Sequence, residues 1–292
     1  MKSRFLIGLA VGLAFAGPGA AAANFEAVRT AEVRVVAGVP TLLINGQPHN
    51  PLIYFGGSHR ITSARDGGGA QPMSAAEWHA KRPRVLHAVE LAANHGVHLH
   101  SIDVWMPWTK PGAEGDFSDA EQAVAAVLAR DPEGMLLLRF TMEPPEWWRN
   151  AHPDELMAWQ GPNGTTQQLE ERNYPQQKTV ASVASEVWRR EAGEQLAHFV
   201  RHMEARFGPH IFGYHFCGQN THEWFYLGSR AEKLNCVEGV FTDSWQRWLR
   251  AKYGSDDALR AAWADPAASF ATAAPPTYDQ RLHASFEFFR DP

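Results

Sequence analysis

The stretch MLLLRF, residues 135–140, decides the fold class, because it is a short and almost wholly apolar run. A strand this apolar is typical of a parallel sheet that is covered on both faces. The same rhythm, a short apolar run followed by a longer amphipathic stretch, predicts further strands over 52–55, 99–104 and 211–217. Strands that alternate with helices in this way indicate an α/β fold.

Helices are expected between and after these strands. The helix predicted over 75–94 ends ahead of Gly96, and Ser118 with Glu121 three residues later matches a capping box that opens the next helix. Further helices are predicted over 185–207, 241–253 and 256–263. Ahead of all of these, two β-rich runs at 32–36 and 41–44 predict a short hairpin.

The first 23 residues have the pattern of a secretory signal peptide. Lys2 and Arg4 precede an apolar run over 5–16, and small residues at 20–23 offer cleavage sites. The alternative is a membrane anchor, but the unbroken run is too short to span a bilayer. We therefore expect a secreted or periplasmic protein that starts near Asn24 and does not bind a membrane once the peptide is removed.

Composition excludes several classes of protein. The chain has 292 residues, of which 45% are apolar and 20% charged, so disorder and collagen are excluded. Its net charge of −5 argues against a nucleic-acid partner. With only 2 cysteines it is not a disulfide-stapled miniprotein. In an oxidising compartment Cys217 and Cys236 could form a disulfide, or they could remain thiols.

The number of strand and helix pairs constrains the architecture. Four pairs occupy residues 52–253, roughly 50 residues each, whereas a closed (β/α)8 barrel takes about 250 residues in all. The chain is then either the N-terminal portion of a TIM barrel, truncated after about four to five units, or an open α/β sheet. We favour the barrel portion. The expected division is a signal peptide at 1–23, a β-hairpin lead-in at 24–50 and a partial barrel at 51–292.

Acidic and aromatic residues follow the predicted strands, where parallel α/β proteins gather their reactive groups. They are Asp103, Trp105 and Trp108 around the end of the second strand, Arg139, Glu143, Glu146, Trp147 and Trp148 around the end of the third, and Asn220, His222, Glu223, Trp224 and Tyr226 after the fourth. Indole faces beside carboxylates and amides suit a sugar, whose C–H face packs on aromatic rings while its hydroxyls form hydrogen bonds. A carbohydrate ligand is therefore expected.

Glu223 is the candidate proton donor for cleavage of a glycosidic bond. It lies directly before Trp224 and Phe225, whose apolar surfaces would withdraw its carboxyl group from water. Such burial raises the pKa of a carboxyl group, as a general acid requires. The alternative is an exposed loop Glu with no catalytic role.

The most distinctive segments are EPPEWW at 143–148 and GYH at 213–215 leading to HEW at 222–224. HGVH at 95–98, WMPW at 105–108 and WQRWLRAKYG at 245–254 accompany them. With these segments the chain, from about Val33 onward, resembles β-galactosidases similar to glycoside hydrolase family 42, in the clan of retaining (β/α)8 glycosidases. The resemblance covers the N-terminal part of the barrel only.

The resemblance implies roles for the candidate residues. The general acid/base of that clan follows the fourth strand, which corresponds to Glu223, and its nucleophile follows the seventh strand, which this chain does not reach. The sugar subsites would be lined by Trp105, Trp108, Glu143, Trp148 and Trp224, with Arg139 bracing their base. Clan members usually carry Asn directly before the acid/base, where this chain has His222, so that Asn220 or His222 would hold the sugar's 2-hydroxyl.

The histidines raise the possibility of a metal site. His98 and His100 alternate onto one face of the second strand, and His215 and His222 flank the fourth. However, no HExxH motif or paired-cysteine spacing accompanies them, and histidines at strand ends usually serve as hydrogen-bonding partners. We therefore expect neither a metal nor another cofactor.

These observations lead to two hypotheses about function. The first is an exported retaining glycoside hydrolase for β-galactosides or related β-linked sugars, inactive as this chain alone because its nucleophile is missing. The second is a carbohydrate-binding protein that keeps the aromatic residues but hydrolyses nothing. The sequence leaves the oligomeric state open.

Overall fold

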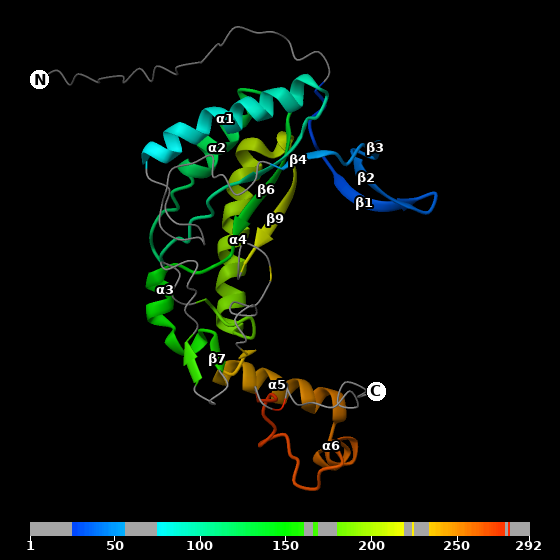
Figure 1. Ribbon diagram of the computed structural model, residues 1–292, viewed down its shortest axis with the longest axis vertical. Coiled ribbons are helices and arrows are strands. Elements are labelled where there is room, and N and C mark those ends of the chain that lie inside the picture. Colours follow the sequence, from blue (N-terminus) through cyan, green and yellow to red (C-terminus); the bar gives the residue numbers. More distant parts are fainter. Residues whose placement is uncertain are drawn as a thin grey trace, which may run out of the picture.

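The computed structural model describes residues 25–55, 75–160, 166–168, 180–218, 224, 234–277 and 280 (Figure 1). Among these, the side chains of 75–82, 166–168 and 234–235 are not described. The expected signal peptide at 1–23 lies outside the described residues, so its assignment stays a prediction.

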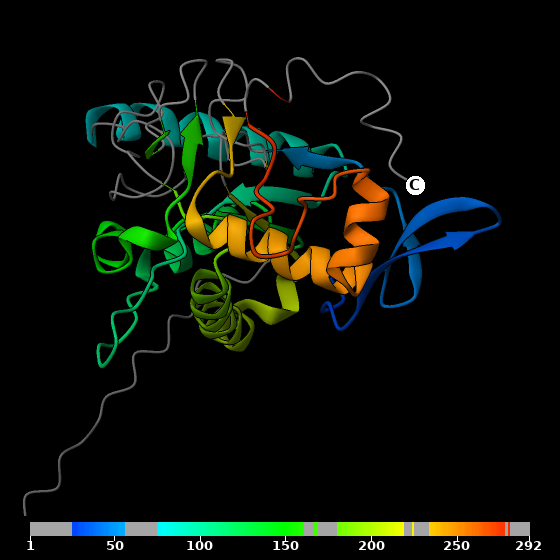
Figure 2. The ribbon, with the colours of Figure 1, turned by 90° about the horizontal axis from the view of Figure 1, so that it is seen from below.

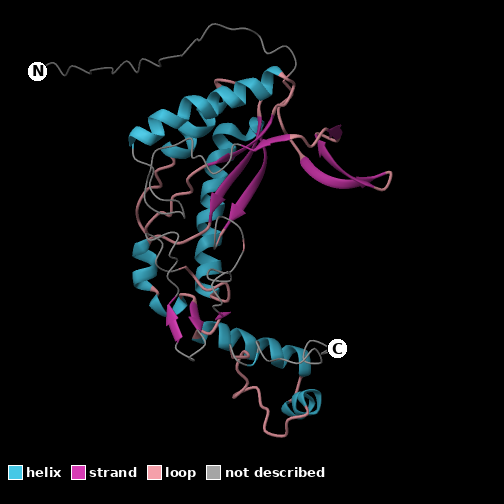
Figure 3. Ribbon diagram, viewed as in Figure 1, coloured by secondary structure: helices cyan, strands magenta, loops and turns pink. Residues whose placement is uncertain are grey.

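A parallel sheet forms the centre of the molecule (Figure 3). Its strands are β4 (Ile53–Phe55), β5 (Leu99–Asp103), β6 (Met135–Thr141) and β9 (Ile211–Cys217). They lie side by side in chain order, and each pairs in parallel with the next. All four strands predicted from the sequence are present, and the α/β class with its N-terminal hairpin is confirmed.

Three long helices cover one face of this sheet. They are α1 (Ala75–Asn94), α2 (Ser118–Leu128) and α4 (Glu186–Phe207). Alternate residues of β6, Leu136, Leu138 and Phe140, are buried against them, together with Phe199 and Met203 of α4. Burying a side chain of this size stabilises the fold by about 1.5–3 kcal/mol.

No helix among the described residues is long and apolar enough to cross a bilayer.

The other face of β6 is less covered than its sequence predicted. Met135 and Leu137, which alternate with the buried residues, stay partly exposed. Successive side chains of a strand point to opposite faces, so this second face is the one without helices in the described part of the chain. The expectation of a strand buried on both faces was therefore wrong for these residues.

The sequence signal for the end of α1 is confirmed, and the cap of α4 at Ser185 is one that the sequence analysis did not predict. Gly96, with φ of +76°, follows the end of α1, and Ser185 caps α4 by accepting a hydrogen bond from the Trp188 amide at 2.9 Å. The predicted capping box of Ser118 and Glu121 is wrong. Phe117 is the N-cap of α2 and makes no side-chain cap bond. Glu121 instead binds α4, accepting from His202 at 2.7 Å and pairing with Arg206 at 3.1 Å.

An antiparallel sheet precedes the parallel one and consists of β1 (Ala31–Val36), β2 (Val39–Ile44) and β3 (Gln47–His49). Between β1 and β2 the chain reverses at Ala37 and Gly38, whose φ values of +50° and +83° suit a two-residue hairpin turn. Figures 1 and 2 show this hairpin projecting from the body of the molecule. Sequence patterning predicted β1 and β2 but did not predict β3.

The base of the hairpin is attached to the amino end of β9. The Val28 amide donates to the Pro209 carbonyl at 2.8 Å, and the rings of Phe25 and His210 stack with centroids 4.3 Å apart. The side chain of Asn45 accepts from the Arg29 amide at 2.8 Å and donates to the Ala27 carbonyl at 2.9 Å. These contacts fix the base of the hairpin while β1 itself stays exposed along its length.

Several short elements lie outside the parallel sheet and the long helices. They are α3 (Glu146–Ala151), the 3-10 turn η1 (Pro153–Glu155) and a small antiparallel sheet of β10 (Leu234–Asn235), β7 (Ala158–Gln160) and β8 (Thr166–Gln168), with a second 3-10 turn, η2 (Gly208–His210), ahead of β9. The buried carboxylate of Glu238 joins this region, accepting from the Ala158 amide at 3.0 Å and from the Ser182 hydroxyl.

Two helices follow Glu238, α5 (Gly239–Tyr253) and α6 (Asp256–Trp263). They form a small core of their own around Leu249 and Leu259. Both helices were predicted from the sequence, α6 with the same bounds. Figure 1 shows them at the end of the molecule away from α1.

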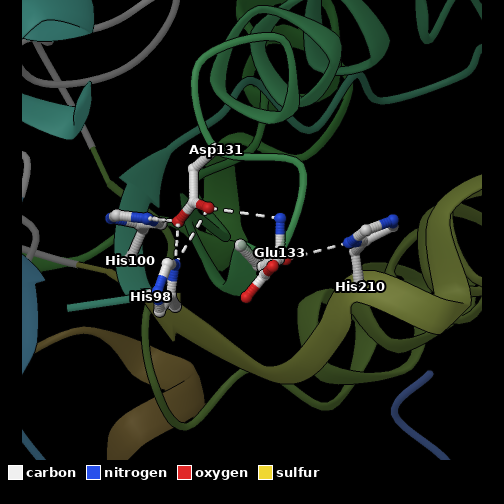
Figure 4. Close-up of polar contacts among 6 residues, drawn as sticks. His98, His100, Asp131, Glu133 and His210 are labelled. Carbon is white, nitrogen blue, oxygen red and sulfur yellow. Dashed lines mark hydrogen bonds and ion pairs between the residues drawn. The ribbon is translucent and has the colours of Figure 1, made fainter. Parts of the chain in front are cut away.

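A buried polar cluster lies at the amino end of the parallel sheet, on its helix-covered side (Figure 4). Asp131, in the turn before β6, accepts a hydrogen bond from His100 Nε2 at 2.6 Å and another from His98 Nδ1 at 3.0 Å. The Glu133 amide donates to the same carboxylate at 3.2 Å. His100 and Asp131 are almost completely buried. The cluster ties the turn before β6 to β5.

The environment of Asp131 lowers its pKa. Burial acts to raise the pKa, but hydrogen bonds from His100 and His98, and the charges of the two rings, outweigh burial. A carboxylate whose pKa is lower in the folded chain than in the unfolded one stabilises the fold above its ordinary pKa of 3.8, and this stabilisation is lost as the pH falls through the folded value.

Asp131→Asn should therefore destabilise the protein at pH 7, by about 1–3 kcal/mol, because it removes charge-assisted hydrogen bonds from a buried cluster. The difference in free energy of unfolding between wild type and variant should shrink as the pH falls below 3.8. Urea unfolding over a pH series measures both effects. Asp154→Asn, at an exposed position, is the matched control and should change little. A difference for Asp131→Asn that is independent of pH would contradict the assignment.

Candidate functional site

Three charged or polar side chains lie in a row across the carboxyl half of the parallel sheet. Strand register places Asp103 of β5 beside Arg139 of β6, and Arg139 beside His215 of β9. All three are on the face that the described helices leave uncovered. In parallel sheets, ligands bind at this end of the strands.

Arg139 is the centre of this row. Its Nη1 donates to Asp103 Oδ1 at 3.5 Å, and its guanidinium carbon lies 5.2 Å from the centre of the Phe55 ring. Both charged side chains are mostly buried, which strengthens their attraction relative to an exposed pair. The role of Arg139 as a brace at the base of a sugar site stays a prediction.

The position of His215 in the row lowers the pKa of its imidazole. His215 is exposed on β9, yet partial burial of its ring lowers its pKa, and the positive charge of Arg139 lowers the pKa further. The imidazole is therefore neutral at pH 7 and offers one donor and one acceptor nitrogen. A neutral imidazole can donate one hydrogen bond to a hydroxyl group and accept one from another.

Trp224 provides an aromatic surface past the end of β9. It remains 46% exposed, yet its position is fixed by several contacts. Its Nε1 donates to the Phe216 carbonyl at 3.3 Å, and its ring meets Trp188 edge to face with centroids 6.4 Å apart. The ring also covers Gly218, where an added Cβ would lie 2.6 Å from Trp224 Cζ3. A half-exposed indole held in this way can stack on the apolar face of a sugar ring.

Glu143 lies just beyond β6 and is buried. Its amide donates to the Thr141 hydroxyl at 3.3 Å. Its charge and that of Glu146 act to raise the pKa of Arg149, although burial outweighs them and lowers that pKa overall. Glu143 is thus a buried carboxylate beside a cation, and its burial leaves little of it accessible to a ligand.

The tryptophans predicted to line the site have different environments. Trp148 is 0% exposed, donates to Glu191 Oε2 at 2.7 Å and meets Trp108 edge to face at 6.1 Å. Its predicted contact with a ligand is wrong, because it packs into the core between α3 and α4. Trp108 is partly buried against the same core, and Trp105 is half-buried. Of the predicted aromatic residues, Trp224 offers the most accessible surface among those the structure describes.

Four predicted site residues lie outside the described residues, namely Asn220, His222, Glu223 and Tyr226. Their roles stay predictions. Cys217 and Cys236 are both buried and are thiols in the structure, so the disulfide considered between them is not formed.

The described residues contain no group of three or more His, Cys, Asp or Glu side chains arranged to hold a metal ion. Of the histidines considered for such a site, His98 and His100 bind Asp131 at the amino end of the strands, whereas His215 lies beside Arg139 near the other end. His222 is outside the described residues.

Sequence reasoning missed Phe55 and Gly218. Phe55 ends a three-residue strand and lies beside Ser101 in the sheet, and its ring contact with Arg139 is a tertiary contact that the sequence does not reveal. Gly218 follows β9 directly, and a Gly at a strand end six residues ahead of a Trp was the available signal. Glycine fits there because any larger side chain would displace the indole.

No protein-family model matches the sequence, and no curated protein matches it. Solved structures similar to the chain include a β-amylase and several β-galactosidases. The catalytic domain of a β-amylase from Paenibacillus polymyxa is 16% identical, with a TM-score of 0.49 over 66% of this chain and 49% of that chain. A β-galactosidase from Marinomonas ef1 is 17% identical, with a TM-score of 0.44 over 78% of this chain and 29% of that chain.

Family 42 β-galactosidases, which the sequence resembles, are among the similar structures. A catalytic mutant of the GH42 β-galactosidase Gan42B from G. stearothermophilus is 18% identical, with a TM-score of 0.44 over 76% of this chain and 29% of that chain. The chain thus spans about half the length of the β-amylase domain and less than a third of these β-galactosidases.

The charge of Arg139 gives a prediction for His215. Arg139→Met should raise the pKa of His215 toward its ordinary value of 6.5 without reaching it, because burial of the ring persists. Titration of the His215 ring protons by NMR measures the change. Arg130→Met, at the amino end of β6, is the control and should leave the titration unchanged. An unchanged pKa of His215 in Arg139→Met would show that the two side chains do not interact.

Proposed function

We propose that this protein is an exported retaining glycoside hydrolase that acts on β-galactosides or related β-linked sugars. Its binding site is at the carboxyl ends of β5, β6 and β9. The observation that carries the proposal is the half-exposed indole of Trp224, fixed over Gly218 directly after Glu223 in the sequence.

The polar groups of the site suit a polyhydroxylated ligand. Asp103 accepts from Arg139 and retains lone pairs that can accept from sugar hydroxyls. His215 is neutral at pH 7 and offers both a donor and an acceptor nitrogen. A flat apolar surface beside a few fixed polar groups is the usual composition of a small-molecule site, and here it matches the apolar face and hydroxyl edge of a pyranose.

Hydrolysis with retention needs two carboxyl groups. In the first step Glu223, as the acid, protonates the departing glycosidic oxygen while a carboxylate attacks the anomeric carbon and forms the glycosyl-enzyme. In the second step the Glu223 carboxylate takes a proton from water, whose oxygen attacks the anomeric carbon and releases the nucleophile. By the family resemblance the nucleophile follows the seventh strand of the barrel, and the described parallel sheet has four strands.

Export is proposed from the sequence of the first 23 residues, with Lys2 and Arg4 ahead of an apolar run and small residues at 20–23. Amino-terminal sequencing of the protein recovered from the periplasm or the medium should find a start near Asn24. Recovery of the intact chain from the cytoplasm alone would contradict this part of the proposal.

Sugar binding should depend on the indole of Trp224. Trp224→Ala should weaken binding of a β-galactoside about tenfold or more, because stacking on an aromatic ring contributes on the order of 1 kcal/mol beyond burial. Gly218→Ala should weaken it less, by displacing the indole rather than removing it. Isothermal titration calorimetry with lactose or a longer β-galactoside measures both.

Trp248→Ala is the matched control for the binding experiment, since Trp248 is 48% exposed on α5 and is not part of the site. Equal binding by wild type and Trp224→Ala would contradict the placement of the site. Loss of binding in Trp248→Ala would show that the sugar binds at α5 instead.

The loss of turnover on replacing Glu223 should depend on how readily the leaving group departs without a proton. In a form of the protein that includes the nucleophile, Glu223→Gln removes the proton donor, so hydrolysis of lactose should fall by several orders of magnitude. Hydrolysis of an aryl β-galactoside, whose leaving group departs without protonation, should lose far less in its first step. Burst and steady-state kinetics on both substrates separate the two steps, and binding should be retained. Glu194→Gln, an exposed Glu on α4, is the control.

An equal loss on both substrates in the glycosylation step would contradict a general-acid role for Glu223. A form of the protein that extends through the seventh strand, binds β-galactosides with Trp224 and turns none of them over would be the carbohydrate-binding protein considered as the alternative.

A further inference from the structure

Strand β1 forms an exposed edge of the antiparallel sheet. The strand order is β1-β2-β3, so among the residues that the structure describes β1 has a neighbour on one side only. All of its residues are exposed, Val33 by 71% and Val35 by 66%. Figures 1 and 2 show the hairpin projecting from the rest of the chain. Exposed edge strands with apolar side chains are templates for pairing with another strand.

The hairpin geometry determines which backbone groups of β1 point outward. Asn45 donates its amide to the Thr30 carbonyl, and Val36 faces Val39 across the two-residue turn. In an antiparallel pair, hydrogen-bonded and non-hydrogen-bonded residues alternate. Thr30, Glu32, Arg34 and Val36 therefore direct their amides and carbonyls toward β2. Those of Ala31, Val33 and Val35 point to the open side.

The side chains of β1 separate into two faces. Glu32 and Arg34 share one face and form an ion pair of 2.9 Å between well-exposed groups. Val33 and Val35 share the other face, and their partners on β2 are Leu42 and Pro40. The edge thus carries one acid and one base on one face and an apolar strip on the other.

We propose that β1 is a self-association strand, and that its partner is β1 of a second copy of this chain, paired antiparallel about Val33. In this arrangement Val33 faces Val33 of the second copy, and Ala31 faces its Val35. These are the residues whose backbone groups point outward, so each of these pairs can exchange its two hydrogen bonds. The two hairpins then form one continuous sheet.

Charge complementarity selects this register. With Val33 at the two-fold axis, Glu32 of each copy lies opposite Arg34 of the other, in the non-hydrogen-bonded positions where side chains are closest. Centring the pair on Glu32 or on Arg34 would place like charges opposite each other, which is destabilising. The same two charges therefore favour one antiparallel register and oppose its nearest alternatives.

The expected dimer is weak. Pairing of one short strand buries far less surface than the roughly 1,200–2,000 Å² of stable interfaces. The dimer should therefore form at high protein concentration and dissociate on dilution. Sedimentation velocity of the wild-type protein from about 1 µM to about 1 mM should show a monomer at the low end and a dimer at the high end.

Charge reversal tests the register. Glu32→Arg alone and Arg34→Glu alone should each remain monomeric over the same range, because each places like charges opposite across the axis. An equimolar mixture of the two variants should dimerise, since every cross-strand pair is then of opposite charge. The double variant with both reversals should dimerise as the wild type does, and Arg34→Lys, which keeps the charge, is the control. Rescue in the mixture cannot come from variants that fail to fold.

Val33→Pro provides a second test. The Val33 amide points away from β2, so proline leaves the hydrogen bonds of the hairpin intact while it removes the central donor of the proposed interface. This variant should be monomeric with an unchanged midpoint of thermal unfolding. A monomeric wild type at every concentration would overturn the proposal. So would dimers that persist in both single charge variants, or a mixture that stays monomeric.

Discussion

Burial of one face of the parallel sheet against α1, α2 and α4 is the constraint on which the site depends. Because side chains alternate along a strand, placing Leu136, Leu138 and Phe140 in the core directs Arg139 to the opposite face. Strand register then brings Asp103 and His215 to either side of it. The polar row is thus a geometric consequence of how the apolar residues are buried.

This arrangement also explains why Arg139 needs its neighbours. A guanidinium that is mostly removed from water requires compensation, which Asp103 supplies as an acceptor and Phe55 as an aromatic face. The same positive charge lowers the pKa of His215 and favours its neutral form. One residue therefore sets the ionic state of a neighbour as well as the position of a carboxylate. Fixed charges of this kind would preorganise the proposed site for a ligand with many hydroxyl groups.

The long elements could be predicted from sequence because their signals are local. The apolar runs of β5, β6 and β9 and the pattern of α6 appear in the structure with bounds that match or nearly match the predictions. Elements held by distant contacts could not be predicted. Strand β7 has three residues and depends on Glu238, whose carboxylate binds an amide 80 residues away. The capping box predicted at Ser118 is absent for a similar reason, because Glu121 accepts a hydrogen bond from His202, 81 residues away on α4.

The site was predicted in outline but not in its contacts. Reading the residues after each strand found Asp103, Arg139 and Trp224, because the carboxyl ends of parallel strands meet at one edge. The same reading placed Trp148 there too. Trp147 and Trp148 are adjacent on the short helix α3, and which of the two enters the core is decided by the packing of that helix on α4. Phe55 and Gly218 carry no chemical group that sequence reasoning looks for.

The proposed self-association and the proposed site are separated by the length of the sheet. The base of the hairpin is attached to the amino end of β9 through Val28 and Pro209. His215 and Trp224 lie toward or beyond the carboxyl end of that seven-residue strand, which at about 3.3 Å per residue is roughly 20 Å long. Only the hairpin edge changes partners on pairing, and the hydrogen bonds of β5, β6 and β9 stay as they are. Association through β1 can therefore bring two sites into one particle without altering the row around Arg139, so that any effect on sugar binding would come from the number of sites rather than from their geometry.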